Sequence, residues 1–143
     1  MGTKARITPA ALLLLGMDSL VSEGGVVSRA KWVARALVEE MSAAMPPGEA
    51  ASSVDRYRDP QRGVTDKAVA RATNELLRTG FIEPRGVGSE AVWVIAPRKE
   101  TDVRRLWAVL TAKERSAVHE AAHRTFALEV AWSKTPRAAA HSS

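Results

Sequence analysis

The chain has 143 residues, 45% of them apolar, which is enough for the core of one domain with an appendage. It contains no cysteine, which excludes disulfides and thiolate metal sites. The formal net charge of +5 and the isoelectric point near 10.1 favour nucleic acid or another anionic partner. Residues 56–85 carry much of this excess, with seven basic and four acidic side chains.

The first predicted helix begins at Thr8, with Pro9 in the first helical position. Proline is favoured there because the N–H that it lacks would have no partner within the helix. The leucine-rich residues 10–15 follow two basic residues, as in a signal peptide, but Gly16-Met17-Asp18 offers no convincing cleavage site. No segment reaches the roughly 18–20 apolar residues that a membrane span needs. We therefore expect a cytoplasmic protein with no membrane contact.

The second predicted helix has Ser28 as its N-cap and an apolar stripe with four-residue spacing. Pro46-Pro47-Gly48 stops this helix. Residues 46–64 show neither a helical nor a strand period, and we predict a long mobile loop there.

The third predicted helix spans residues 66–78, with Thr65 or Asp66 as its cap and Gly80 beyond its end. Two short strands follow, at 81–83 and 91–95, joined by a glycine-containing hairpin loop. Residues 102–110 form the fourth predicted helix. The fifth runs to about residue 132 and starts with a capping box of Thr111 and Glu114.

The helix at 66–78 separates its side chains by chemistry. At about 100° per residue, Val69, Ala72 and Leu76 share one face. The opposite face carries Lys67, Arg71, Asn74 and Arg78. Lys and Arg bind phosphates or guanine edges, and Asn can bond adenine through two hydrogen bonds, so this face suits the DNA major groove. The alternative is an ordinary solvated helix face.

Residues 8–96 resemble the winged helix-turn-helix DNA-binding superfamily, on the order of the elements and on Leu77-Arg78-Thr79-Gly80-Phe81-Ile82 leading into a hairpin. The resemblance implies a mainly α fold with a small β-hairpin wing over residues 8–97, and binding of double-stranded DNA. It also implies that the helix at 66–78 reads the major groove and that Arg85, in the wing, contacts the DNA backbone or minor groove.

The long stretch 46–64 departs from the family, in which a short turn joins the second helix to the recognition helix. Arg56, Arg58 and Arg62 in this stretch could add DNA contacts, and Tyr57 could stack on bases. A winged helix can instead serve as a protein-interaction module within a replication or mobile-element complex.

One enzyme-like motif is present, the sequence His119-Glu120-Ala121-Ala122-His123. In zinc hydrolases two histidines at this spacing bind zinc and the glutamate acts as base. A catalytic zinc needs a third protein ligand, for which only Glu129 and His141 follow. We therefore favour a structural role for His119 and His123, no enzyme activity and no cofactor, and keep the zinc hydrolase as an outlying alternative.

Residues 98–135 form a predicted C-terminal helical extension, and 136–143 a tail. The extension carries much apolar surface, from which we predict a homodimer with residues 101–132 packed across the interface; the alternative is that they fold back on their own domain. The sequence thus predicts a nucleoid-associated transcriptional regulator that binds specific DNA sequences.

Overall fold

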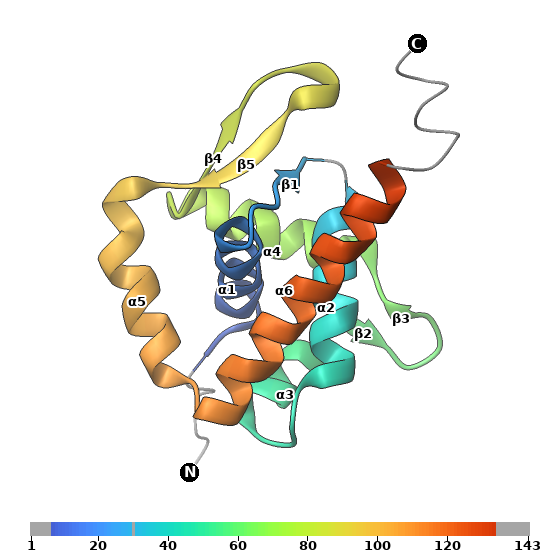
Figure 1. Cartoon of the computed structure of the whole chain (residues 1–143). Coiled ribbons are helices and arrows are strands. Elements are labelled where there is room, and N and C mark those ends of the chain that lie inside the picture. The colour runs from blue at the N-terminus through green and yellow to red at the C-terminus, as the bar shows by residue number, and fades with distance from the viewer. Residues whose placement is uncertain (1–6, 30, 134–143) are drawn as a thin grey trace.

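The computed structural model describes residues 7–29 and 31–133, and these form a mainly helical fold with a small antiparallel sheet (Figure 1). The predicted fold class is confirmed at this level; the predicted tail, 136–143, lies outside the described residues. The helices are α1 (Pro9–Ser22), α2 (Lys31–Ala44), α3 (Glu49–Asp55), α4 (Asp66–Arg78), α5 (Glu100–Val109) and α6 (Ala112–Ser133). The strands are β1 (Val27–Ser28), β2 (Arg58–Asp59), β3 (Gly63–Val64), β4 (Ile82–Arg85) and β5 (Val92–Ile95).

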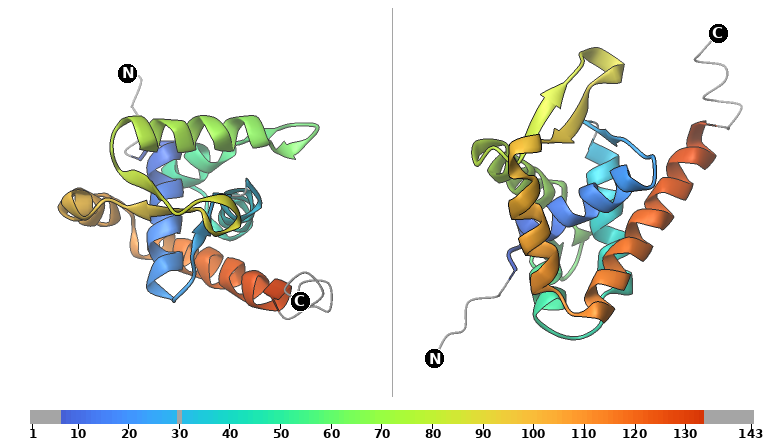
Figure 2. Two further views of the ribbon diagram at one scale, coloured as in Figure 1. Left: turned by 90° about the horizontal axis from the view of Figure 1, so that it is seen from above. Right: turned by 60° about the vertical axis from the view of Figure 1, so that its left-hand side comes forward.

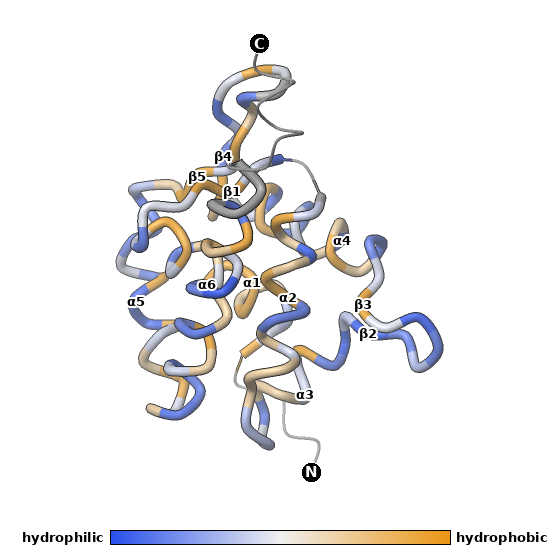
Figure 3. The backbone as a smooth tube through the Cα atoms, turned by 45° about the vertical axis from the view of Figure 1, so that its right-hand side comes forward, coloured by the Kyte–Doolittle hydropathy of each residue, from blue (hydrophilic) through white to orange (hydrophobic). Residues whose placement is uncertain are grey.

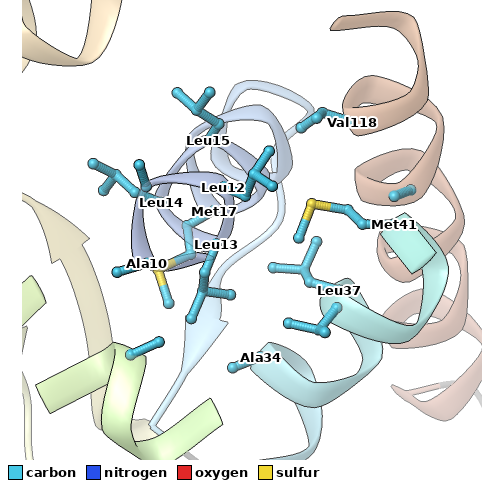
Figure 4. Close-up of a cluster of buried hydrophobic side chains, with 14 of the residues drawn as sticks. Ala10, Leu12, Leu13, Leu14, Leu15, Met17, Ala34, Leu37, Met41 and Val118 are labelled. Carbon is cyan, nitrogen blue, oxygen red and sulfur yellow. The ribbon is translucent and has the colours of Figure 1, made fainter. Parts of the chain in front are cut away.

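Helix α1 lies at the centre, in contact with α2, α4, α5 and α6. Its four consecutive leucines, Leu12–Leu15, are all fully buried, so this helix is covered on every side and not along one stripe. Figure 4 shows Leu37 and Met41 of α2 and Val118 of α6 around these leucines. Burying a leucine side chain contributes about 1.5–3 kcal/mol, so α1 supplies much of the core. Near the end of the helix, Val21 is 47% exposed.

Side-chain caps fix the starts of α1 and α6 as predicted. Thr8 Oγ1 accepts a hydrogen bond from Ala11 N–H at the start of α1. Before α6, the Thr111 N–H donates to Glu114 Oε1 and the Glu114 N–H donates to Thr111 Oγ1, which completes the capping box. Among the described residues, no helix combines the length and the apolar surface that crossing a bilayer requires.

The three-stranded sheet has the order β1-β5-β4, with Val27 opposite Trp93 and Ile82 opposite Ile95. Ser28, which we predicted to cap α2, lies in β1, opposite Val92. The residue directly before α2 lies outside the described residues, so the cap itself stays a prediction.

Residues 46–64 were predicted to be a mobile loop, and this is a correction. The segment contains α3 and the hairpin of β2 and β3. It buries Ala50, Val54 and Val64 in the main core, and Ser53 Oγ donates a hydrogen bond to the Ile7 carbonyl over 2.5 Å. Seven residues of helix and two-residue strands are too short to show a periodic pattern in the sequence.

The C-terminal helices pack on the rest of their own chain. The side of α6 that carries Val118, Ala121, Ala122 and Thr125 is buried, and α6 contacts both α1 and α2. Trp107 of α5 donates its indole N–H to Asp18 of α1 over 2.8 Å. Part of the surface that we assigned to a dimer interface is therefore buried within the chain, whereas Leu128 is 49% exposed, and the homodimer stays a prediction.

Candidate nucleic-acid interface

Helix α4 lies at one edge of the molecule, and α1 and α2 separate it from α6 (Figure 2). Thr65 is its N-cap: the side chain accepts a hydrogen bond from Ala68 N–H over 3.2 Å. Val69, Ala72 and Leu76 are buried against the core, as predicted. Burial of this face fixes the helix rotation, so the opposite face points away from the protein.

The outward face of α4 carries the four predicted residues, and all of them are exposed. Within the described residues none of the four side chains has a hydrogen-bond or ion-pair partner. Three of them are cationic and the fourth is an amide that both donates and accepts. The face is therefore free to bind an anionic, hydrogen-bonding surface. Its members are Lys67, Arg71, Asn74 and Arg78.

The acidic residues of α4 lie away from the centre of this face. Asp66 Oδ1 lies 3.4 Å from Arg35 Nη1 of α2, and Arg35 also pairs with Glu39 over 2.8 Å. The hydrogen bond to Glu39, and then the charge of Asp66, raise the pKa of Arg35. Glu75 lies at the flank, close enough to Tyr57 for its charge to act on the phenol. The outward face of α4 therefore has no carboxylate among its four members.

The β2–β3 hairpin leads directly into α4, and its hydrophilic tip projects from the molecule (Figure 3). Asp59 Oδ1 accepts hydrogen bonds from the backbone N–H groups of Gln61 and Arg62, which shapes this tip. The side chains of Arg62 and Arg56 are exposed and have no partner among the described residues. Arg58 is also exposed, but it donates a hydrogen bond to Ser42 Oγ of α2 over 2.9 Å.

Tyr57 was considered as a stacking residue for bases, and the structure contradicts this. Its side chain is only 2% exposed, and its hydroxyl donates to the Pro9 carbonyl. Burial, and then the charge of Glu75, raise the pKa of the phenol above its ordinary value. Tyr57 is thus a core residue whose ring is not available for stacking on nucleic acid.

The β4–β5 hairpin leaves the other end of α4. Arg85, which we predicted to contact DNA, lies 3.2 Å from Glu83 Oε1. Arg98 lies 3.3 Å from the other oxygen of the same carboxylate, so Glu83 neutralises part of this hairpin. The hairpin tip carries Val87, which is 85% exposed. Arg85 is therefore less available to an anionic partner than the arginine side chains of α4.

A groove of about 160 Å³ between α4 and β5 contains two residues that the sequence did not indicate. The guanidinium carbon of Arg29 lies 5.1 Å from the ring centroid of Trp93, a cation–π contact. Asn74 lines the same groove. Arg29 follows β1 and reaches Trp93 only because β1 pairs with β5, a long-range contact that no local pattern reveals.

We compared the chain with known protein families, curated proteins and solved structures. No protein family, curated protein or solved structure matches the chain. The assignment of function therefore depends on the residues themselves.

The two histidines of the zinc-like motif are engaged with α1 and α5. A hydrogen bond of 2.7 Å joins His119 Nδ1 to Ser19 Oγ, and the His119 ring stacks on Trp107 with centroids 4.7 Å apart. His123 Nδ1 lies 3.1 Å from Glu23 Oε1. Across residues 7–29 and 31–133, no group of three histidine, aspartate or glutamate side chains is placed to hold a metal ion. His141, one candidate third ligand, lies outside the described residues.

Proposed function

We propose that this protein binds double-stranded DNA as a winged-helix transcriptional regulator, with α4 as the helix that enters the major groove. The single observation that carries the proposal is the exposed, unpartnered face of Lys67, Arg71, Asn74 and Arg78. Cationic side chains that have no partner within the protein have no internal bond to give up when they meet phosphates. They keep their full attraction for the DNA backbone.

The dimensions of α4 support this role. A helix of 13 residues is roughly 20 Å long and about 10–12 Å wide, which matches the major groove of B-DNA. Arg71 and Asn74 lie at the middle of the face and would reach base edges. Lys67 and Arg78, one near each end, would contact phosphates on either side of the groove.

The two hairpins that flank α4 would extend the contact along the backbone. Arg62, at the tip of the β2–β3 hairpin, and Arg56 have free side chains and would add phosphate contacts. Arg58 and Arg85 would contribute less, because each already has a partner in the protein. Arg29 would approach a phosphate from the groove beside α4, with its orientation set by Trp93.

The test is fluorescence-anisotropy binding to random-sequence duplex DNA across a salt series. We expect affinity to fall steeply with salt, and Arg71→Ala to cost about 1–3 kcal/mol of binding free energy. The matched control is Arg124→Ala. Arg124 is an exposed arginine on α6 that pairs with Glu120, and α6 lies on the opposite side of the molecule from α4 (Figure 2). The Arg124→Ala substitution removes the same charge as Arg71→Ala and should leave DNA binding nearly unchanged.

Selection of preferred sites from a random library separates base contacts from phosphate contacts. We expect Asn74→Ala to relax specificity at one position, and Lys67→Ala to weaken all sequences equally and lower the salt slope by about one. Equal losses for Arg71→Ala and Arg124→Ala, or no binding at low salt, would contradict the proposal.

A protein-interaction module is the second candidate, and one observation favours it. The tip of the β4–β5 hairpin carries the apolar Val87, 85% exposed, beside an arginine that Glu83 already neutralises. Such a tip suits a protein surface better than a phosphate backbone. Absence of DNA binding in the salt series would favour this function.

A further inference from the structure

A cleft of about 530 Å³ lies between the start of α1, the end of α3 and one flank of α4. We propose that this α1–α4 cleft binds a small zwitterion with an apolar body, such as a free amino acid with an apolar side chain. The volume is within the range of small-ligand sites, about 300–1,000 Å³. The regulatory consequence below rests on the proposed DNA binding, whereas the ligand site itself does not.

The floor of the cleft is apolar. Ala10 of α1, Ala68 and Ala72 of α4, and Tyr57 line it. These short side chains leave room for a ligand, and the Tyr57 ring is held in place by its hydrogen bond to Pro9. An apolar ligand body would lose contact with water here, which is the main source of affinity in such sites.

Two arginines on the cleft wall select an anionic group. Arg56 and Arg71 both line the cleft, and both lack a partner among the described residues. The N-terminus of α1 points its partial positive charge to the same region, at Thr8 and Pro9. An arginine can bind a carboxylate through two parallel hydrogen bonds, which gives the site a preference for that group.

Glu75 adds a negative charge, so that the wall of the cleft carries both signs of charge. Glu75 lies one helical turn after Arg71, yet the two side chains form no ion pair. On a helix, an ion pair is weaker when the arginine precedes the glutamate than when it follows it. A free carboxylate on the wall repels a phosphate and attracts an ammonium group. A ligand that carries both a carboxylate and an ammonium group satisfies both signs of charge.

Arg71 belongs both to this cleft and to the outward face of α4. A ligand carboxylate that binds Arg71 would turn its guanidinium away from DNA. Ligand and DNA would therefore weaken each other, and the two effects must be equal by thermodynamic linkage. The cleft would make DNA binding sensitive to the concentration of a small metabolite.

Ligand binding is tested without DNA by following Tyr57. Because the chain has a single tyrosine, protein with carbon-13 in its tyrosine rings gives NMR signals from this residue alone. The probes are L-phenylalanine, 3-phenylpropanoate and 2-phenylethylamine, which carry both charges, the anion only and the cation only. We expect L-phenylalanine to shift the Tyr57 signals saturably, and each single-charge probe to bind at least about tenfold more weakly.

Variants then assign the charges. Arg56→Gln should weaken L-phenylalanine and 3-phenylpropanoate alike, Glu75→Gln should weaken L-phenylalanine and 2-phenylethylamine, and the control Arg124→Gln should change nothing. No saturable shift with any probe, or equal binding of L-phenylalanine and 3-phenylpropanoate, would overturn the zwitterion site. Saturating L-phenylalanine should also raise the Kd for DNA about tenfold. If the protein binds no DNA, the proposed function fails while the NMR result still decides the cleft.

Discussion

The hydroxyl of Tyr57 donates a hydrogen bond of 2.5 Å to the backbone carbonyl of Pro9. This contact ties the segment between α2 and α4 to the first turn of the central helix. Ser53, four residues before Tyr57, makes a similar contact with the Ile7 carbonyl, two residues before Pro9. Together they hold α3 beneath α1, and they place the β2–β3 hairpin at the start of α4.

Stability should therefore depend on pH through Tyr57. Burial raises the pKa of its phenol, so the folded state keeps the proton that the unfolded chain releases near pH 10. The stabilisation is present below about pH 10 and is lost as the pH rises further. Tyr57→Phe should remove this alkaline loss and cost about 1 kcal/mol of unfolding free energy at neutral pH. Urea unfolding of wild type and Tyr57→Phe at neutral and alkaline pH measures both the alkaline loss and the cost at neutral pH. If the unfolding free energies of the two proteins fall equally with pH, Tyr57 is not the source of the alkaline loss.

The cap of α4 should contribute to its stability. Thr65→Ala removes the acceptor of the Ala68 N–H and should lower the unfolding free energy by about 1 kcal/mol. Thr65→Ser keeps the hydroxyl and is the matched control, expected to stay close to wild type. Chemical denaturation of the three proteins provides the comparison. An equal loss for serine and alanine would mean that the methyl group, and not the hydrogen bond, matters.

Two glycines of the β4–β5 hairpin separate backbone strain from steric clash. Gly86 and Gly88 both have positive φ, +74° and +62°, which costs a substituted residue about 1–2 kcal/mol. A Cβ on Gly86 would also lie 2.9 Å from the Glu90 carbonyl oxygen, whereas a Cβ on Gly88 meets nothing within 4 Å. Gly86→Ala should therefore be the more destabilising of the two in thermal unfolding. The reverse order would show that the hairpin tip rearranges.

Of the two histidines of α6, His119 should stabilise the fold more than His123, and neither should need a metal ion. His119→Ala loses the stacking on Trp107 and the bond to Ser19, and should cost about 1–2 kcal/mol. His123→Ala loses an exposed contact with Glu23 and should cost less than about 1 kcal/mol. A chelator should leave the melting temperature unchanged. A large drop with chelator would instead revive the zinc interpretation.

Glu129 should weaken the fold at neutral pH. Burial raises its pKa, against the opposing effect of the Val26 N–H, and Oε1 is buried with no hydrogen-bond partner among the described residues. A raised pKa means that stability is present below the ordinary value of about 4.3 and is lost as the pH rises through the folded value. Glu129→Gln should therefore raise the melting temperature at neutral pH, and the difference should vanish at acidic pH. Glu120→Gln, on the exposed side of α6, is the control and should show neither effect.

The sequence by itself determined the helices with strong local signals and the face that α4 presents. Thr65, the spacing of Val69, Ala72 and Leu76, and the Thr111–Glu114 capping box act within one or two helical turns. Hydrogen bonds and periodicity at this range depend on neighbours in the chain, so they can be recognised without knowledge of the fold.

Only the tertiary structure decided which of the candidate residues are free. Arg85 and Arg58 have partners, Tyr57 is buried, and the buried face of α6 packs on α1 and α2. Each of these outcomes depends on contacts between segments, or on local side-chain geometry that residue type does not specify. Burial of α1 on all sides, the pairing of Ser28 with Val92 and the cleft shared by Arg56 and Arg71 have the same origin. The physical reason is that packing energy is set by which surfaces meet, and a sequence pattern records only which surfaces are apolar.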